Sequence, residues 1–205
     1  MCAIIGSIGS SIDDKKFLAA RARMSHRGPD DAGFWRASEG GVMLGHRRLS
    51  IIDLTPGGHQ PMMSADGRYV IVYNGEIFNY IELKKELAEY LFCSASDTEV
   101  LLAAYAKWGK ECLKKLNGQF AFAIYDIKER ALFAARDHFG IKPFYYAIQN
   151  NALLFASEIK GLLALGVPAR PKERIIYEYL AFGLYDHSES TFFGGIKSLP
   201  PGHFL

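Results

Sequence analysis

Residues 1–6 of the chain read MCAIIG, in which a cysteine follows the initiator methionine and a short β-branched run ends in glycine. Such a run is typical of a strand that begins at the N-terminus. If Met1 is removed, the Cys2 thiol and a free α-amine belong to one residue, and both titrate near neutral pH. An N-terminal amine can then act as general base for its own side chain. Position alone does not separate this interpretation from a buried cysteine with no chemical role.

The composition is that of a globular protein, with 205 residues, 49% hydrophobic and 22% charged. A formal net charge of +2 with scattered basic residues gives no argument for a nucleic-acid or membrane partner. No apolar run approaches a membrane span, and the N-terminus lacks a secretory pattern. The other cysteines, Cys93 and Cys112, show no CxxC spacing and the histidines form no metal-binding pair. We therefore expect a cytoplasmic protein with reduced, structural Cys93 and Cys112 and no metal site.

Strand patterns gather toward both ends of the chain, with helical patterns between and after them. Strands are expected at 2–9, 33–38, 41–51, 68–73, 119–126, 130–137, 143–148 and 152–157. Helices are expected at 13–24, 79–91 and 96–108, and near Glu158 and Lys172. Neither strict strand–helix alternation nor an internal repeat is present. This order favours an α+β layered sandwich in which antiparallel sheets pack together and helices lie outside.

Two helix starts carry capping signals. Asn79 is expected to cap the first helix, with Glu82 three residues later and Phe78 and Leu83 as a hydrophobic staple. The apolar face of that helix is expected to contain Leu83, Leu87, Tyr90 and Leu91. Ser96 and Glu99 form a capping box for the second helix. Its buried stripe is expected to contain Val100, Leu101, Ala104, Tyr105 and Trp108.

The segment NGEIFNY, residues 74–80, follows an apolar strand. Asn-Gly between apolar runs is a hairpin signal, but helix-start chemistry rather than a second strand follows it. A strand that ends here would expose the Asn74 amide and the Gly75 N–H. Both groups are neutral donors of the kind that stabilise an oxyanion.

Three charged residues have two interpretations each. Alternation along a strand places Arg47 and Arg48 on opposite faces, so one of them points toward a core or cleft, where a guanidinium suits a carboxylate. The other is a solvated outer residue, for which Arg48 is a candidate. Asp97 lies in the first turn of a helix, where an acid is favourable in any case, or it holds a ligand's ammonium group.

Several of these stretches, in this order, resemble the glutaminase domain of class II, N-terminal-nucleophile glutamine amidotransferases, in particular the N-terminal half of asparagine synthetases. The resemblance rests on MCAIIG, SHRGPDDAG, GHRRLSIIDL, GGHQPM, YNGEIFNY, SDTE, LNGQFAFAIYD and ARDHFGIKPFYY. It therefore covers nearly the whole chain. It implies a four-layer αββα sandwich of two mainly antiparallel sheets, which agrees with the pattern of elements.

The resemblance also implies hydrolysis of the glutamine side-chain amide to glutamate and ammonia. Cys2 would be the nucleophile and its own α-amine the base. The oxyanion would be stabilised by Asn74 and the Gly75 N–H. The substrate zwitterion would be bound by Arg47 at its carboxylate, by Asp97 and Glu76 at its ammonium group, and by backbone groups near Ile51 and Ile52. No cofactor is implied for this chain.

We expect one glutaminase domain over residues 1–205, with about 190–205 leading toward a C-terminal synthetase domain that this sequence lacks. The resemblance implies that such a domain uses ATP and magnesium, through an SGGxDS loop not found here, to convert aspartate to asparagine with the ammonia. We therefore expect a fragment whose partners are glutamine and that domain, with a homodimer left open. The alternatives are an enzyme that amidates another acceptor and a catalytically idle docking domain.

Overall fold

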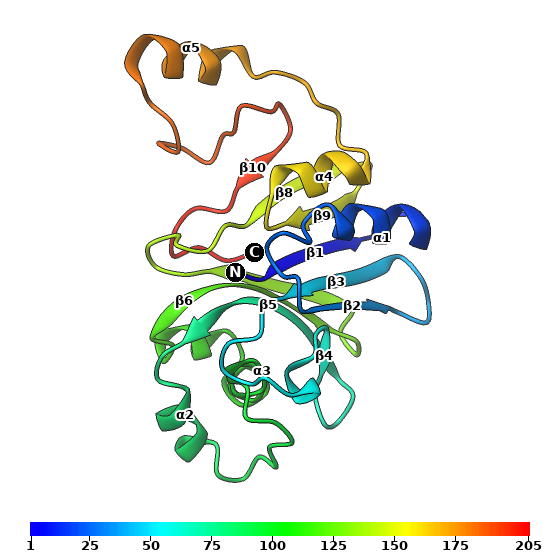
Figure 1. Cartoon of the computed structure of the whole chain (residues 1–205), viewed down its shortest axis with the longest axis vertical. Helices are drawn as coiled ribbons and strands as arrows, with labels where there is room; N and C mark the ends of the chain where they lie inside the picture. The colour runs from blue at the N-terminus through cyan, green and yellow to red at the C-terminus, as the bar shows by residue number, and fades with distance from the viewer.

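The computed structural model describes all residues from Met1 to Leu205, and its centre is a pair of packed sheets (Figure 1). The first sheet has the order β10 (Lys197–Ser198), β8 (Tyr145–Gln149), β9 (Ala152–Ala156), β1 (Ala3–Ile8), β3 (Val42–Arg48) and β2 (Asp31–Arg36). The second has the order β4 (Met62–Met63), β5 (Tyr69–Ile77), β6 (Gly118–Asp126) and β7 (Ala131–Arg136). Every strand pair is antiparallel.

Helices cover the outer face of each sheet, which completes the αββα order (Figure 1). The first sheet carries α1 (Asp14–Ala22) and α4 (Ile159–Leu165), and the second carries α2 (Tyr80–Glu86) and α3 (Asp97–Trp108). Short 3₁₀ turns, η1 (Pro56–Gly58) and η2 (Gly109–Lys114), precede β4 and follow α3. The last helix, α5 (Glu173–Phe182), stands apart from both sheets.

The strands are apolar on both sides because each sheet has a covered inner and outer face. On β1, Ile4 enters the core between the sheets and Ile5 enters the core under α1 and α4. On β5, Val72 faces the other sheet and Tyr73 faces α3. Each fully buried side chain of this size contributes roughly 1.5–3 kcal/mol. The predicted layered sandwich is thus confirmed.

The prediction that a strand ends at Asn74 was wrong. β5 continues to Ile77 because β6 offers a partner along its whole length, with Asn74 opposite Ala121 and Gly75 opposite Phe120. The pairing also excludes a hairpin turn at Asn74-Gly75. These two residues therefore lie inside a strand that forms part of the sandwich.

The predicted cap of α2 was also wrong. The Asn79 side chain bonds the turn before β6 instead, donating to the Lys115 carbonyl and accepting from the Asn117 N–H, each at 2.9 Å. Phe78 is 58% exposed and Leu91 is 84% exposed, so neither joins the core. The prediction failed because a tertiary partner competes for the asparagine amide.

The start of α3 follows the prediction in part. Ser96 Oγ accepts the Glu99 N–H at 3.3 Å, as a capping box requires. The Glu99 carboxylate, however, accepts from the N–H groups of Cys93 and Ser94 rather than from Ser96. Cys93 itself is exposed, whereas Cys112 is buried as expected. None of the helices is long and apolar enough to cross a membrane.

Candidate active site

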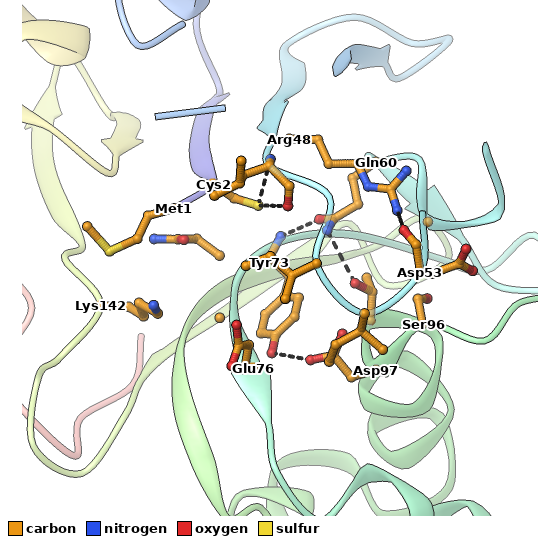
Figure 2. A pocket seen from close by; sticks show the side chains of 17 residues that line it. Met1, Cys2, Arg48, Asp53, Gln60, Tyr73, Glu76, Ser96, Asp97 and Lys142 are labelled. Atoms are coloured by element: carbon orange, nitrogen blue, oxygen red, sulfur yellow. Dashed lines mark hydrogen bonds between the residues drawn. The ribbon is translucent and has the colours of Figure 1, made fainter. Parts of the chain in front are cut away.

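A cavity of about 200 Å³ opens where the N-terminus, the end of β3, β5 and the start of α3 meet (Figure 2). It is smaller than the roughly 300–1,000 Å³ of pockets for drug-sized ligands, and it suits an amino acid. The structure places most of the predicted site residues on its wall. These are Cys2, Ile51, Ile52, Asn74, Gly75, Glu76 and Asp97.

Arg47 is the exception, and its assignment to the cleft was wrong. It shares a face of β3 with Met43, on the side covered by α1, and its Nε donates to the Gly28 carbonyl at 2.9 Å. Arg48 lies on the opposite face, with Leu44 of the core between the sheets, and lines the cavity. Alternation correctly separated the two arginines, but it could not say which face carries the cavity.

The Arg48 guanidinium is held by the loop that follows β3. Nη1 donates to the Thr55 carbonyl at 2.8 Å, and Nη2 donates to the Asp53 carbonyl. Gly58 makes room for it, since a Cβ at this position would collide with Nη2. The second glycine of GGHQPM therefore has a packing reason in the placement of this arginine.

Cys2 lies directly before β1 and is half-buried, and its side chain points into the cavity region near Arg48 (Figure 2). Sγ accepts the Leu49 N–H at 3.4 Å and approaches the Leu49 carbonyl at 3.6 Å. The Cys2 carbonyl accepts from Arg27 Nε at 2.9 Å, and Arg27 is itself bonded to Glu158 at 3.2 Å. The residue is thus held at its main chain and at its sulfur.

Burial raises the pKa of the Cys2 thiol above its ordinary value of 9.0. The thiol is therefore protonated at neutral pH and needs a base before it can attack. With Met1 attached, as in this structure, the Cys2 nitrogen is an amide and cannot take a proton. Removal of Met1 would place a basic amine on the same residue.

Asn74 offers the cavity an unused donor. The residue is 1% exposed, and its side-chain Nδ2 has no hydrogen-bond partner in the protein. An unsatisfied buried donor costs about 1–3 kcal/mol, a cost that an acceptor on a ligand would remove. The amide therefore fits an oxyanion or carbonyl oxygen in the cavity.

The Gly75 N–H faces the same cavity by the geometry of the sheet. Phe120 on β6 lies opposite Gly75, but its N–H and carbonyl are both bonded to Asp137, on the side of β6 away from β5. The Gly75 N–H therefore does not donate to Phe120. Alternate N–H groups of a strand point to the same edge. The N–H groups of Tyr73 and Ile77 meet Gln60 and Asp97 at the free edge of β5. The Gly75 N–H lies between them and points to that edge.

Asp97 closes the other side of the cavity from the N-terminus of α3. Oδ2 accepts the Tyr73 hydroxyl at 2.7 Å and the Ile77 N–H at 2.9 Å. Burial raises the pKa of this carboxyl, while these hydrogen bonds and helix N–H groups lower it. Together with Glu76 on β5, it gives one part of the cavity an acidic lining.

Five further polar residues on the wall were not assigned roles from the sequence: Asp53, Gln60, Tyr73, Thr98 and Lys142. Gln60 and Lys142 lie in GGHQPM and ARDHFGIKPFYY, which carried the resemblance but gave no separate chemical signal. Lys142 is 7% exposed, and its ammonium group makes no hydrogen bond within the protein. Tyr73 looked only like the last apolar residue of a strand.

A buried histidine links the two sheets beneath the cavity. His46 Nε2 on β3 lies 3.0 Å from the Tyr73 carbonyl on β5, and a carbonyl can only accept, so Nε2 donates. Burial lowers the pKa of His46 from 6.5 to about 3. The ring is therefore neutral, and it holds β5 against β3 at the residue before Asn74.

Comparison with known proteins identifies the chain's relatives. Residues 1–205 match the profile of the glutamine amidotransferase domain family. The chain belongs to this family. It is a class II domain, homologous to the N-terminal domains of asparagine synthetases.

Two relatives illustrate the range of this glutamine amidotransferase domain. The chain is 40% identical over 218 aligned positions to glutamine-hydrolysing asparagine synthetase 3 of Bacillus subtilis (strain 168), covering 100% of this chain and 34% of that protein. It is 41% identical over 187 positions to amidase chry2 of Gibberella zeae, covering 89% of this chain and 27% of that protein. The chain thus spans about a third of the length of these relatives.

Solved structures show that the domain has the N-terminal-nucleophile amidotransferase fold. The glutamine phosphoribosylpyrophosphate amidotransferase of B. subtilis, complexed with ADP and GMP, superposes with a TM-score of 0.69 at 21% identity. The match covers 80% of this chain and 44% of that one. At this identity the likeness concerns the fold alone.

Proposed function

We propose that this amidotransferase domain hydrolyses the side-chain amide of glutamine to glutamate and ammonia, with Cys2 as the nucleophile. One observation carries the proposal: the Cys2 sulfur shares a small cavity with the unpartnered Asn74 amide. The first can attack a carboxamide, and the second can stabilise the oxygen that becomes negative. Family membership supports glutamine as the donor.

The reaction proceeds through a thioester. The free α-amine of Cys2, once Met1 is gone, takes the thiol proton directly or through one water, and the sulfur attacks the carboxamide carbon. Asn74 Nδ2 and the Gly75 N–H stabilise the oxyanion. The carbon–nitrogen bond then breaks, and the leaving nitrogen receives a proton from the α-ammonium and departs as ammonia. Water, deprotonated by the same amine, attacks the thioester and releases glutamate and the thiol.

The two charged ends of glutamine are bound at the inner part of the cavity. Arg48, in the place first assigned to Arg47, binds the α-carboxylate, because it is the one of the two arginines that lines the cavity. Asp97 and Glu76 bind the α-ammonium group. The main chain at Ile51 and Ile52 adds contacts along the wall. No metal or other cofactor is needed for these steps.

We further propose that the ammonia serves ATP- and magnesium-dependent amidation of aspartate by a synthetase domain of the same polypeptide. The support is that several relatives are named asparagine synthetases and are about three times as long as this chain. Because other relatives are named amidases, the second candidate function is transfer of the ammonia to a different acceptor. The unpaired Asn74 donor disfavours a docking domain without activity, because a purely structural role does not require a buried amide that lacks a partner.

The decisive experiment measures glutamate and ammonia formed from glutamine by protein whose N-terminus is verified by mass spectrometry. Protein that begins at Cys2 should release both products in equal amounts, whereas protein that retains Met1 should be nearly inactive. The Cys2→Ala variant, likewise freed of Met1, is the matched control and should show no turnover. An active Met1-bearing protein would contradict the role of the α-amine. Glutamine-dependent amidation of aspartate, tested against other carboxylate acceptors in a full-length protein, separates the two acceptor proposals.

A further inference from the structure

Tyr73 joins three elements around the cavity, although it offers no group to the cavity's reactive end. Its N–H donates to Gln60 Oε1 at 2.7 Å, and its carbonyl accepts from His46 Nε2 at 3.0 Å. Its hydroxyl donates to Asp97 Oδ2 at 2.7 Å (Figure 2). The residue is 2% exposed, and its ring packs among the apolar side chains under α3. It is therefore fixed at its backbone and at the tip of its side chain.

The hydroxyl contact determines how the Asp97 carboxylate is used. Oδ2 accepts from both Tyr73 and the Ile77 N–H, so this oxygen is occupied by the protein. Oδ1 accepts no hydrogen bond from another side chain, and Asp97 lines the cavity. The two bonds on Oδ2 fix the plane of the carboxylate, and no other side chain competes with a ligand for Oδ1.

We propose that Tyr73 is a positioning residue for the ammonium end of the substrate, whose hydroxyl keeps the Asp97 carboxylate ionised and oriented toward the cavity. The proposal rests on the proposed glutaminase function and deepens it. Tyr73 acts through Asp97 and does not touch the reacting amide.

The physical reason is the burial of Asp97, which is 5% exposed. A buried carboxylate stays ionised only when donors replace the water it has lost. A hydrogen bond to a charged group is worth about 1.5–3 kcal/mol. Burial also raises the pKa of Tyr73 well above 10, so the hydroxyl keeps its proton and remains a donor.

Other charged groups face Asp97 across the cavity, and they must be separated from it in any pH experiment. They are the thiol of Cys2 and, once Met1 is removed, its α-amine, together with Arg48, Asp53, Glu76 and Lys142. Hydrogen bonds from Thr55 lower the pKa of Asp53, so it titrates below its ordinary range. Glu76 is the other carboxyl of the ammonium end, and it makes no hydrogen bond with the Tyr73 hydroxyl. A change caused by Tyr73 should therefore depend on Asp97.

The test is Tyr73→Phe, which removes the donor and keeps the ring in the core. We expect KM for glutamine at pH 7 to rise about tenfold and kcat to stay within about twofold, as for a lost contact to the substrate's ammonium group. The part of the kcat/KM profile that belongs to Asp97, which is distinct from the acid limb set by the Cys2 α-amine, should move to higher pH, because Asp97 is protonated more easily without the hydroxyl. Thermal unfolding of the variant verifies that it folds.

Glutaramate, which is glutamine without its α-amino group, serves as the matched probe. Used as a competitive inhibitor of glutamine hydrolysis, it should have the same inhibition constant for wild type and Tyr73→Phe. In an Asp97→Asn background, which already lacks the carboxylate, Tyr73→Phe should change KM no further.

Unchanged KM and an unchanged Asp97 part of the pH profile in Tyr73→Phe, or equal weakening of glutamine and glutaramate, would overturn the inference while leaving glutaminase activity intact. A wild-type protein that releases no glutamate would instead overturn the proposed function, and the inference with it. The wild-type assay thus distinguishes the two failures.

Discussion

The sulfur of Cys2 accepts the N–H of Leu49 at 3.4 Å, across 47 positions of sequence. This contact exists because β1 and β3 are antiparallel, with Ala3 opposite Arg47, so that the start of one strand lies beside the end of the other. Leu49 follows Arg48 directly. The pairing of two strands therefore brings the proposed nucleophile next to the guanidinium that we propose binds the substrate carboxylate.

Cys2→Ser should bind glutamine and lose most turnover. The hydroxyl occupies nearly the same place, but it is a far weaker nucleophile than a thiol at neutral pH. Glutamate release and the competitive inhibition constant of glutamate, measured on the same Met1-free protein, separate chemistry from binding. Cys93→Ser and Cys112→Ser are the controls, since Cys93 is exposed and Cys112 lies in the core of the second sheet. Full activity in Cys2→Ser would contradict the nucleophile assignment.

Arg48→Ala should raise KM for glutamine by about tenfold to a hundredfold, which corresponds to the loss of a charged hydrogen bond of about 1.5–3 kcal/mol. Part of the loss comes from release of the loop at Asp53 and Thr55, which the guanidinium holds. Arg47→Ala is the matched control on the neighbouring position, and it should leave KM within about twofold. Steady-state kinetics of both variants shows which of the two arginines, on opposite faces of β3, binds the substrate carboxylate. A larger KM effect at Arg47 would contradict the placement.

Asn74→Ala should lower kcat by roughly 10²–10³ and change KM little, as for removal of one oxyanion donor. Asn79→Ala, an asparagine from the same sequence motif whose amide bonds the Lys115 turn, should reduce stability and leave kcat unchanged. Kinetics and thermal unfolding of the pair distinguish the two effects. If Asn74→Ala raised KM alone, the residue would bind the ground state rather than the oxyanion.

His46 should make the fold acid-sensitive. The pKa of His46 is about 3 in the folded protein and 6.5 in the unfolded chain. Below pH 6.5 the unfolded chain therefore binds a proton at His46 that the folded protein does not bind. The neutral ring's full contribution is present above pH 6.5 and is lost as pH falls toward 3. The free energy of unfolding should then fall by up to about 1.4 kcal/mol for each pH unit. Denaturant unfolding of wild type and His46→Gln over this range should show a shallower slope in the variant; equal slopes would contradict the assignment.

The fold was predictable where the pattern had one physical explanation. Strands such as RYVIVY, apolar on both faces, need cover on both sides, and the αββα order follows from that need together with the resemblance. The failures were local. Asn79 found a partner in the turn at Lys115, and β5 ran past Asn74 because β6 was there to pair with it. Neither partner is visible within a window of sequence.

The residues of the candidate site were partly predictable, because their chemistry is distinctive. Cys2, Asn74, Gly75 and Asp97 were named from residue type and motif, and they line one cavity. The choice between Arg47 and Arg48 needed the orientation of β3, which alternation does not supply. Tyr73 was missed because one hydroxyl among apolar neighbours gives no pattern.

The free edge of β5 has a second consequence. β4 pairs only with Val70 and Ile71, and beyond it the main-chain N–H groups of Tyr73 and Ile77 donate to the Gln60 and Asp97 side chains. An uncovered edge invites pairing with another chain, which leads to aggregation. The Gln60 and Asp97 side chains, which line the cavity, thus also protect this strand edge from pairing with another chain. Substitution of Gln60 should therefore reduce solubility.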